Sequence, residues 1–317
     1  MVGDKVFNDR QLKLITPKLK NFIVKPFGMP ETAWKKIAPV KSVKSRQGVF
    51  YVMKDTGLFE LADRISPSEW ARDNKGDWTS SSYVLEDFGR GFFVTKDELL
   101  DADSELNLLQ SRINLAMVNL ELRKEYEFFK LVNQSSSYGL TVSESNPWVN
   151  SATGEPNNTV NIVQRLNLLK DKFAEQTNYT IYPNTLIVTE KFANLLAGHD
   201  QIYEINKYTK SDIYESIGIP KRLAGLRIVT VASKYIGTVQ RRKSAPAKTP
   251  MMEDNMAILS YSNKTPDNTW IVCFQRGGKK MLTKENNAKV FSGAVEETYA
   301  FKVIQPKYAM KITGIYA

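Results

Sequence analysis

The chain has 317 residues and is 42% hydrophobic, 25% charged and 11% aromatic, which excludes the disordered, collagen-like and disulfide-scaffold classes. The single cysteine, Cys273, and the single histidine, His199, exclude an intrachain disulfide and any metal site built from several cysteines or histidines. The net charge of +10 favours a polyanionic partner.

The amino-terminal segment is strongly basic. Residues 1–46 hold eleven Lys or Arg and three acids, and four prolines interrupt any helix or central strand. We therefore predict an extended basic arm over residues 1–47. Large apolar side chains such as Trp34 and Ile37 require a surface to pack on. The segment has no signal-peptide core and no apolar run approaches a membrane span, so we expect a soluble protein of a reducing cytoplasm.

Residues 48–95 have strand character at both ends. Val49, Tyr51 and Met53 alternate with other side chains, and later strands are expected near 83–85 and 92–95. The polar residues between them predict a long two-stranded ribbon with a soft tip. Such a ribbon is marginally stable alone and needs a neighbour.

Helices are predicted from spacing and capping signals. Thr95 and Glu98 match a capping box, and apolar residues recur at helical spacing over 104–133, including Leu120. Further helices are expected over 158–175 and from about Thr189.

Strands are predicted over 185–188 and 227–231, and the tail 298–316 is expected to be β, interrupted at 305–306. Residues 256–261 and 270–274 are predicted to pair as a hairpin, and 241–250 to form a basic loop. Because helices and strands show no regular alternation, the fold class is α+β.

The motifs of common enzymes are absent. The sequence has no Walker A motif, GxSxG, HExxH or CxxC. Gly89–Arg90–Gly91 lacks the third glycine of a dinucleotide fingerprint, and residues 276–280 are better explained as a charged turn. His199 is interpreted as a solvated or capping side chain, and Cys273 as a small buried residue. The acids at 97–105 are attributed to the helix dipole rather than to a metal. We expect no enzymatic activity, cofactor or metal.

Two stretches resemble the major capsid proteins of tailed bacteriophages. In residues 83–138 a strand leads through an acidic turn into a long helix that ends near Arg123–Lys124–Glu125. In residues 146–213 a Trp-containing loop and a helix precede Pro-Asn-Thr-Leu-Ile-Val, and a helix with paired leucines and Gly-His follows. Family members often have His-Pro where this chain has His199–Asp200.

The resemblance implies the Hong Kong ninety-seven type shell fold, which encapsulins share. It implies an N-terminal arm at 1–47, an extended loop (E-loop) at 48–95, a peripheral domain with the long spine helix at 96–145 plus 281–310, and an axial domain at 146–280 plus 311–317. The implied function is that of a major capsid protein, assembled in the host bacterial cytoplasm as pentamers and hexamers around double-stranded DNA. Scaffold, portal and decoration proteins are further expected partners, and no membrane is. The arm residues expected to contact neighbours or DNA are Lys13, Lys18, Lys20, Lys35 and Lys36.

Three other functions remain open from the sequence. An encapsulin-like compartment would enclose protein instead of DNA. A basic nucleic-acid-binding protein would need an aromatic and basic groove, which the pattern does not indicate. A different structural component of the virion is the third.

Overall fold

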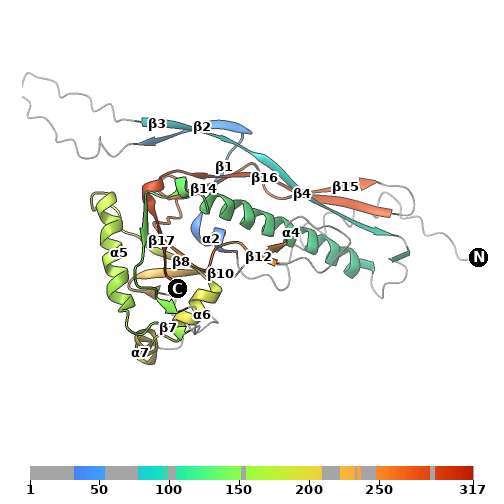
Figure 1. Cartoon of the computed structure of the whole chain (residues 1–317). Helices are drawn as coiled ribbons and strands as arrows, with labels where there is room; N and C mark the ends of the chain where they lie inside the picture. The colour runs from blue at the N-terminus through green and yellow to red at the C-terminus, as the bar shows by residue number, and fades with distance from the viewer. Residues whose placement is uncertain are drawn as a thin grey trace, which may run out of the picture. The chain divides into compact units, whose positions relative to one another are not determined.

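A computed structural model describes residues 32–53, 78–95, 97–98, 105–150, 155–208, 222–232, 234–236, 248–285 and 290–316. The fold is α+β, as predicted, and helices and strands do not alternate regularly (Figure 1). Within the described residues, no helix is long and apolar enough to cross a membrane. The chain divides into two compact units. The first takes described residues of 87–124 and 279–297, and the second takes those of 32–86, 125–278 and 298–316.

In the first unit, residues 105–124 of one long helix pack against a small sheet. Strand β16 (Val290–Val303) pairs antiparallel with β15 (Lys280–Glu285) along its first half and also pairs with β4 (Glu86–Thr95). The helix is α4 (Glu105–Val132), which confirms the longest helix predicted from the sequence. Its apolar stripe packs with the inward side chains of the sheet, and the buried members are Phe92, Val94, Leu109, Ile113, Ala116, Met117, Leu120 and Val295.

The predicted capping box is present at the end of β4. The backbone N–H of Thr95 donates to Glu98 Oε2 at 3.0 Å, and the backbone N–H of Glu98 donates to Thr95 Oγ1 at 3.2 Å. Each side chain thus satisfies the backbone donor of the other. The Thr95 backbone donor is the main cause that lowers the pKa of Glu98. Asp101 and Asp103, which the sequence analysis attributes to the helix dipole, lie outside the described residues.

The second unit is built on a six-stranded sheet in the order β5-β17-β13-β8-β10-β9. The strand bounds are β5 Leu140–Ser143, β8 Thr185–Thr189, β9 Arg222–Leu223, β10 Leu226–Val231, β13 Met256–Ser260 and β17 Ala309–Thr313. Helices α5 (Ile162–Gln176) and α6 (Glu190–Ala197) bury their apolar faces against one side of this sheet. Asn161 and Thr189 cap the two helices, so α5 begins four residues later than predicted and α6 begins where predicted.

The second unit contains further elements outside this sheet and its two helices. They are α2 (Ala33–Ile37), α7 (Asp200–Tyr208), β1 (Val40–Ser42), β2 (Gln47–Met53), β3 (Trp78–Val84), β6 (Val149–Asn150), β7 (Glu155–Pro156), β11 (Lys234–Ile236), β12 (Lys248–Pro250) and β14 (Ile271–Gln275), with 3-10 turns at Ser135–Ser137 and Pro306–Tyr308. Strand β14 pairs parallel with β1 and antiparallel with the second half of β16.

The predicted hairpin of residues 256–261 with 270–274 is wrong. Strand β13 pairs with β8 and β17, whereas β14 pairs with β1 and β16. Each strand is buried along almost its whole length, so each needs neighbours on both edges. Strands distant in sequence supply those neighbours, and the turn-rich loop between β13 and β14 carries the chain from one sheet to another.

Candidate assembly surfaces

The ribbon formed by β2 and β3 carries several exposed large apolar side chains. These strands pair antiparallel over seven residues, from Gln47 opposite Val84 to Met53 opposite Trp78. Among the described strands they pair only with each other, so each presents an open edge. Open edges can accept another strand. The predicted tip, residues 54–77, lies outside the described residues.

One face of this ribbon is apolar and exposed. Val49, Tyr51 and Trp78 share it and are 59%, 68% and 56% exposed. Across the ladder, Val49 lies opposite Ser82 and Tyr51 opposite Ser80. Serines cannot cover large apolar side chains, so neither Val49 nor Tyr51 has an apolar partner directly across the ladder. A contiguous exposed apolar surface of this kind indicates an interaction site.

The opposite face of the ribbon attaches it to the second unit. The rings of Tyr83 and Phe274 are stacked, with centroids 4.5 Å apart and planes at 7°. Phe50 lies against the same Phe274 ring at 5.5 Å. Leu85 and Val272 complete this buried cluster. The two faces therefore have different roles: one rests on the subunit and the other is left open.

The end of the predicted arm is folded into the second unit. Trp34 and Ile37 of α2 are buried, and the ring of Trp34 meets Phe301 edge-on at 5.6 Å. The buried carboxylate of Glu125 accepts from the backbone N–H of Ala33 at 3.0 Å and of Trp34 at 3.2 Å. These two bonds satisfy donors at the start of the helix. The apolar side chains of Trp34 and Ile37, which require a surface to pack on, therefore find it on their own chain.

The other end of α2 is also held by a distant side chain. Arg227 Nη2 donates to the carbonyl oxygen of Lys36 at 2.5 Å, and Ser262 Oγ donates to that of Ile37 at 2.6 Å. Burial, and then the neighbouring Arg222, lower the pKa of Arg227. Both ends of α2 are therefore held by side chains distant in the sequence.

The five predicted contact lysines fall in two groups. Lys13, Lys18 and Lys20 lie outside the described residues. The structure brings Lys35 and Lys36 together on α2, with Lys35 exposed and its ammonium 5.6 Å from the centre of the Trp34 ring. Lys36 is half-buried, and its carbonyl accepts the Arg227 bond.

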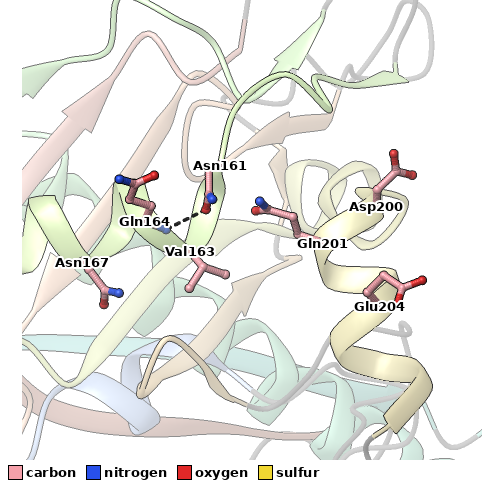
Figure 2. Close-up of a pocket in the computed structure, with 7 residues that line it drawn as sticks. All are labelled: Asn161, Val163, Gln164, Asn167, Asp200, Gln201 and Glu204. Carbon is pink, nitrogen blue, oxygen red and sulfur yellow. Dashed lines mark hydrogen bonds between the residues drawn. The ribbon is translucent and has the colours of Figure 1, made fainter.

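A hollow lined mostly by residues with polar side chains lies between α5 and α7. It has a volume of about 610 Å³ and is lined by Asn161, Val163, Gln164, Asn167, Asp200, Gln201 and Glu204 (Figure 2). Asn161 Oδ1 accepts from the backbone N–H of Gln164 at 2.9 Å, and Gln201 Oε1 from that of Ile162 at 3.0 Å. These amides of the first turn are thus occupied, and the two carboxylates would repel an anion. The hollow does not fit a phosphate site.

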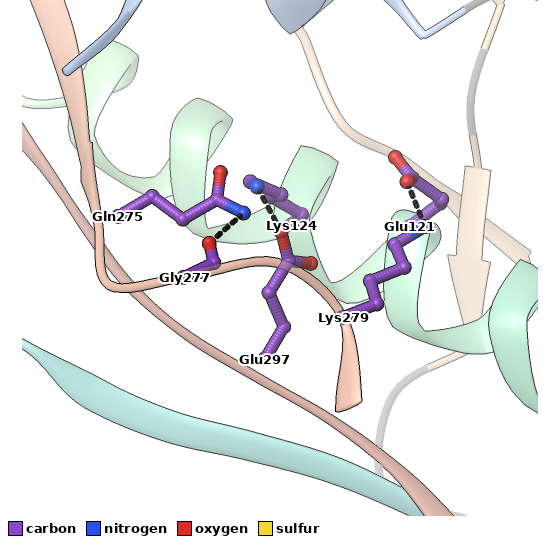
Figure 3. Close-up of polar contacts among 6 residues, drawn as sticks. All are labelled: Glu121, Lys124, Gln275, Gly277, Lys279 and Glu297. Atoms are coloured by element: carbon purple, nitrogen blue, oxygen red, sulfur yellow. Dashed lines mark hydrogen bonds and ion pairs between the residues drawn. The ribbon is translucent and has the colours of Figure 1, made fainter. Parts of the chain in front are cut away.

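Two ion pairs join α4 to strand β16 and to Lys279, the residue before strand β15. Lys124 Nζ lies 2.6 Å from Glu297 Oε1, and Lys279 pairs with Glu121 (Figure 3). The Lys124 and Glu297 side chains are 2% and 3% exposed, so no substrate could reach them. This buried pair has a structural role.

The residues considered as catalytic or phosphate-binding candidates also have structural roles. Cys273 is buried in β14, as predicted, and Gly89 and Gly91 lie within strand β4. His199 caps the start of α7, where its Nδ1 accepts from the backbone N–H of Gln201 at 3.2 Å. The alternative that His199 is solvated is wrong, because the side chain is fully buried. No group of three or more metal-ligating side chains occurs among the residues that the structure describes.

Sequence reasoning missed the attachment of the ribbon. The Phe274 ring appeared only as part of an apolar strand, and Gly48 as an ordinary residue of the ribbon. A glycine inside a strand often marks the close approach of another group, so Gly48 was the signal for this attachment in the sequence. Glu125, the carboxylate that holds α2, gave no signal because its partners are 91 and 92 residues away.

No protein-family model and no curated protein matches this sequence. Solved structures do match it over nearly the whole chain. A phage-related protein from Bordetella bronchiseptica has 17% identity and a TM-score of 0.64, covering 94% of this chain and 97% of its own. The capsid of cyanophage P-SCSP1u has 11% identity and a TM-score of 0.62, covering 94% of both chains.

An encapsulin complex also shares this architecture. The SrpI encapsulin of Synechococcus elongatus has 10% identity and a TM-score of 0.52, covering 95% of both chains. Phage capsid and encapsulin structures thus align with this chain almost from end to end. The chain has the Hong Kong ninety-seven type shell fold.

Proposed function

We propose that this chain is the major capsid protein of a tailed bacteriophage, which assembles into an icosahedral shell around double-stranded DNA. One observation carries the proposal: an apolar ribbon face with open edges, on a chain with the fold of phage capsid proteins. In a lone subunit this face would stay in water. In a shell, neighbouring copies bury it.

The contact between copies is heterologous in this proposal. The ribbon of one copy rests on a different surface of the next, and such contacts close into rings when the rotation allows. Pentamers and hexamers are rings of this kind. Strand edges supply backbone hydrogen bonds, and Tyr51 and Trp78 supply large aromatic contact area. Many modest contacts per subunit would stabilise the shell.

We assign the parts of the chain by the same proposal. Residues 1–47 form the arm, 48–95 the E-loop, 96–145 plus 281–310 the peripheral domain, and 146–280 plus 311–317 the axial domain. The arm lysines, including the exposed Lys35, contact neighbouring copies or DNA. Contacts with phosphate need no sequence reading, so DNA binding would be non-specific and sensitive to salt.

The proposal places the protein in the virion, after assembly in the host cytoplasm. Scaffold, portal and decoration proteins are its further partners. We propose no enzymatic turnover, because the buried Lys124–Glu297 pair and His199 have structural partners and Cys273 lies buried in a strand.

An encapsulin-like compartment is the second candidate, because the SrpI encapsulin aligns over 95% of this chain. The two candidates differ in cargo. Particles purified from the natural host would contain nuclease-protected DNA in the first case and protein in the second.

The assembly itself is tested by electron microscopy of the expressed protein. We expect closed shells of uniform diameter. Tyr51→Asp should abolish shells while leaving the subunit folded, since this side chain is 68% exposed. Thr79→Asp is the matched control, because it adds the same charge at an exposed position on the opposite face of the ribbon. Shells that form equally well from both variants would remove the ribbon face from the interface. Only monomers from the unsubstituted protein would count against a shell.

A further inference from the structure

Within the cluster that holds the ribbon to the rest of the second unit, one aromatic ring meets both strands of the ribbon. Phe274 contacts Tyr83 from β3 by parallel stacking and Phe50 from β2 at 5.5 Å. Both strands of the ribbon thus meet the same side chain of β14. Beyond this point the described ribbon residues are largely exposed. The direction of the ribbon is therefore decided at its base.

A glycine also lies close to the Tyr83 ring. The ladder places Gly48 directly opposite Tyr83. A Cβ atom built on Gly48 would lie 2.5 Å from Tyr83 Oη, 2.7 Å from Cζ and 2.8 Å from Cε1. Three atoms of one rigid ring are involved, so relief requires the whole ring to move. Because the ring is stacked on Phe274, such a movement disrupts the stack.

We propose that Gly48 is a positioning residue for assembly: it leaves the space in which Tyr83 lies flat between β2 and Phe274, and this stack sets the direction of the ribbon. The inference rests on the proposed shell function. A strand rises about 3.4 Å per residue, so the five residues after Gly48 span roughly 17 Å. A tilt of about 10° at the base would move the far end by roughly 3 Å. That displacement is enough to separate the exposed aromatic side chains from a neighbouring copy.

The first experiment compares two glycine-to-alanine variants. Gly48→Ala should reduce the fraction of subunits in closed shells at least tenfold, or change the shell diameter. Gly278→Ala is the matched control, since a Cβ there meets nothing within 4 Å, and it should assemble like the unsubstituted protein. Far-UV circular dichroism checks that both variants fold. Shells of normal number and diameter from Gly48→Ala would overturn the proposal.

A double substitution tests whether Gly48 acts through Tyr83. Tyr83→Ala removes the ring, so adding Gly48→Ala to it should change the assembled fraction less than twofold. An undiminished tenfold loss in that background would show that Gly48 acts by another route, and would overturn the proposal.

A third measurement separates this inference from the shell function. Hydrogen exchange on unassembled subunits should be at least tenfold faster in the β2 and β3 peptides of Gly48→Ala than in those of Gly278→Ala. This result is expected even if the unsubstituted protein forms no shells. Equal exchange in the two variants would refute the stack as the support of the ribbon.

Discussion

Removal of the Glu297 carboxylate should destabilise the first unit by about 3 kcal/mol. Glu297 accepts from Lys124 Nζ at 2.6 Å, and both side chains are almost fully buried. Breaking a buried pair from one side typically costs about 3–5 kcal/mol, because the other charge stays in a medium of low dielectric constant. We expect the lower end, since Glu121 lies one turn away from Lys124 on α4 and can offset part of the loss.

Hydrogen exchange is the appropriate assay for Glu297→Ala. The described tryptophans, Trp34, Trp78, Trp148 and Trp270, all lie in the second unit, so tryptophan fluorescence would report mainly on that unit. Peptides from α4 and from the first half of β16 report on the first unit directly. At about 1.4 kcal/mol per tenfold change, the expected loss corresponds to exchange that is roughly a hundredfold faster.

An exposed ion pair provides the control. Lys41 and Asp267 lie 3.2 Å apart, with side chains 47% and 83% exposed, so Asp267→Ala should cost only about 0–1 kcal/mol. The double variant Lys124→Met with Glu297→Leu should recover most of the loss, because it removes both buried charges. A change in local stability for Glu297→Ala no larger than that for Asp267→Ala would contradict the expected cost of an unpaired buried charge. A double variant less stable than the single one would contradict it too.

Three further outcomes are expected. Leu120→Asp should leave the protein mostly insoluble, because it buries an unpaired carboxylate. Leu115→Asp, at a position 54% exposed on the same helix, should stay soluble. Equal solubility of the two variants would contradict the assigned buried face of the helix. His199→Ala should lower the free energy of unfolding by about 1–3 kcal/mol in denaturant titrations, and His199→Gln by less, because Gln can both donate and accept; equal losses would argue against the capping role. Because the pKa of Glu98 is lowered, its bond with Thr95 stabilises the fold above the ordinary pKa of 4.5, and this stability is lost as the pH falls through the lowered value. The Glu98 carboxyl should therefore titrate below 4.5 by NMR. A midpoint at the ordinary value would refute the bond.

Elements with local signals could be predicted from the sequence. Helix α4 follows from an uninterrupted apolar spacing, and the Thr95–Glu98 box from a four-residue pattern. Helix α6 begins at its Thr189 cap. In each case the neighbouring residues of the pattern lie within about one helical turn of one another, so the signal is local in the sequence.

The pairing of buried strands could not be predicted in this way. Strands β13 and β14 are apolar throughout, and a turn-rich loop joins them, which favours a hairpin. Nothing in their local pattern identifies β17, β8, β1 or β16 as the actual neighbours. An apolar strand indicates burial but does not identify its partner.

Lys124 shows how a buried charge can be overlooked. Positions 113, 117, 120, 124 and 128 of α4 follow one helical stripe, and four of them are apolar. The fifth, Lys124, continues the stripe into the core, where Glu297 from a strand 173 residues away receives its charge. Its helical position predicts burial, but the identity of its partner depends on the tertiary fold.

The strand pattern of the ribbon distinguishes its two faces. Val49 and Tyr51 have the alternation of a half-buried strand, which by itself would indicate a core. Their cross-strand partners are serines, and a core face made of Val–Ser and Tyr–Ser pairs would have little apolar packing. The opposite face pairs Gly48 with Tyr83, and this aromatic side chain rests on Phe274. The side that carries an internal partner is therefore the one with Tyr83. The apolar residues opposite serines stay exposed in the subunit, and in the proposed shell a neighbouring copy buries them.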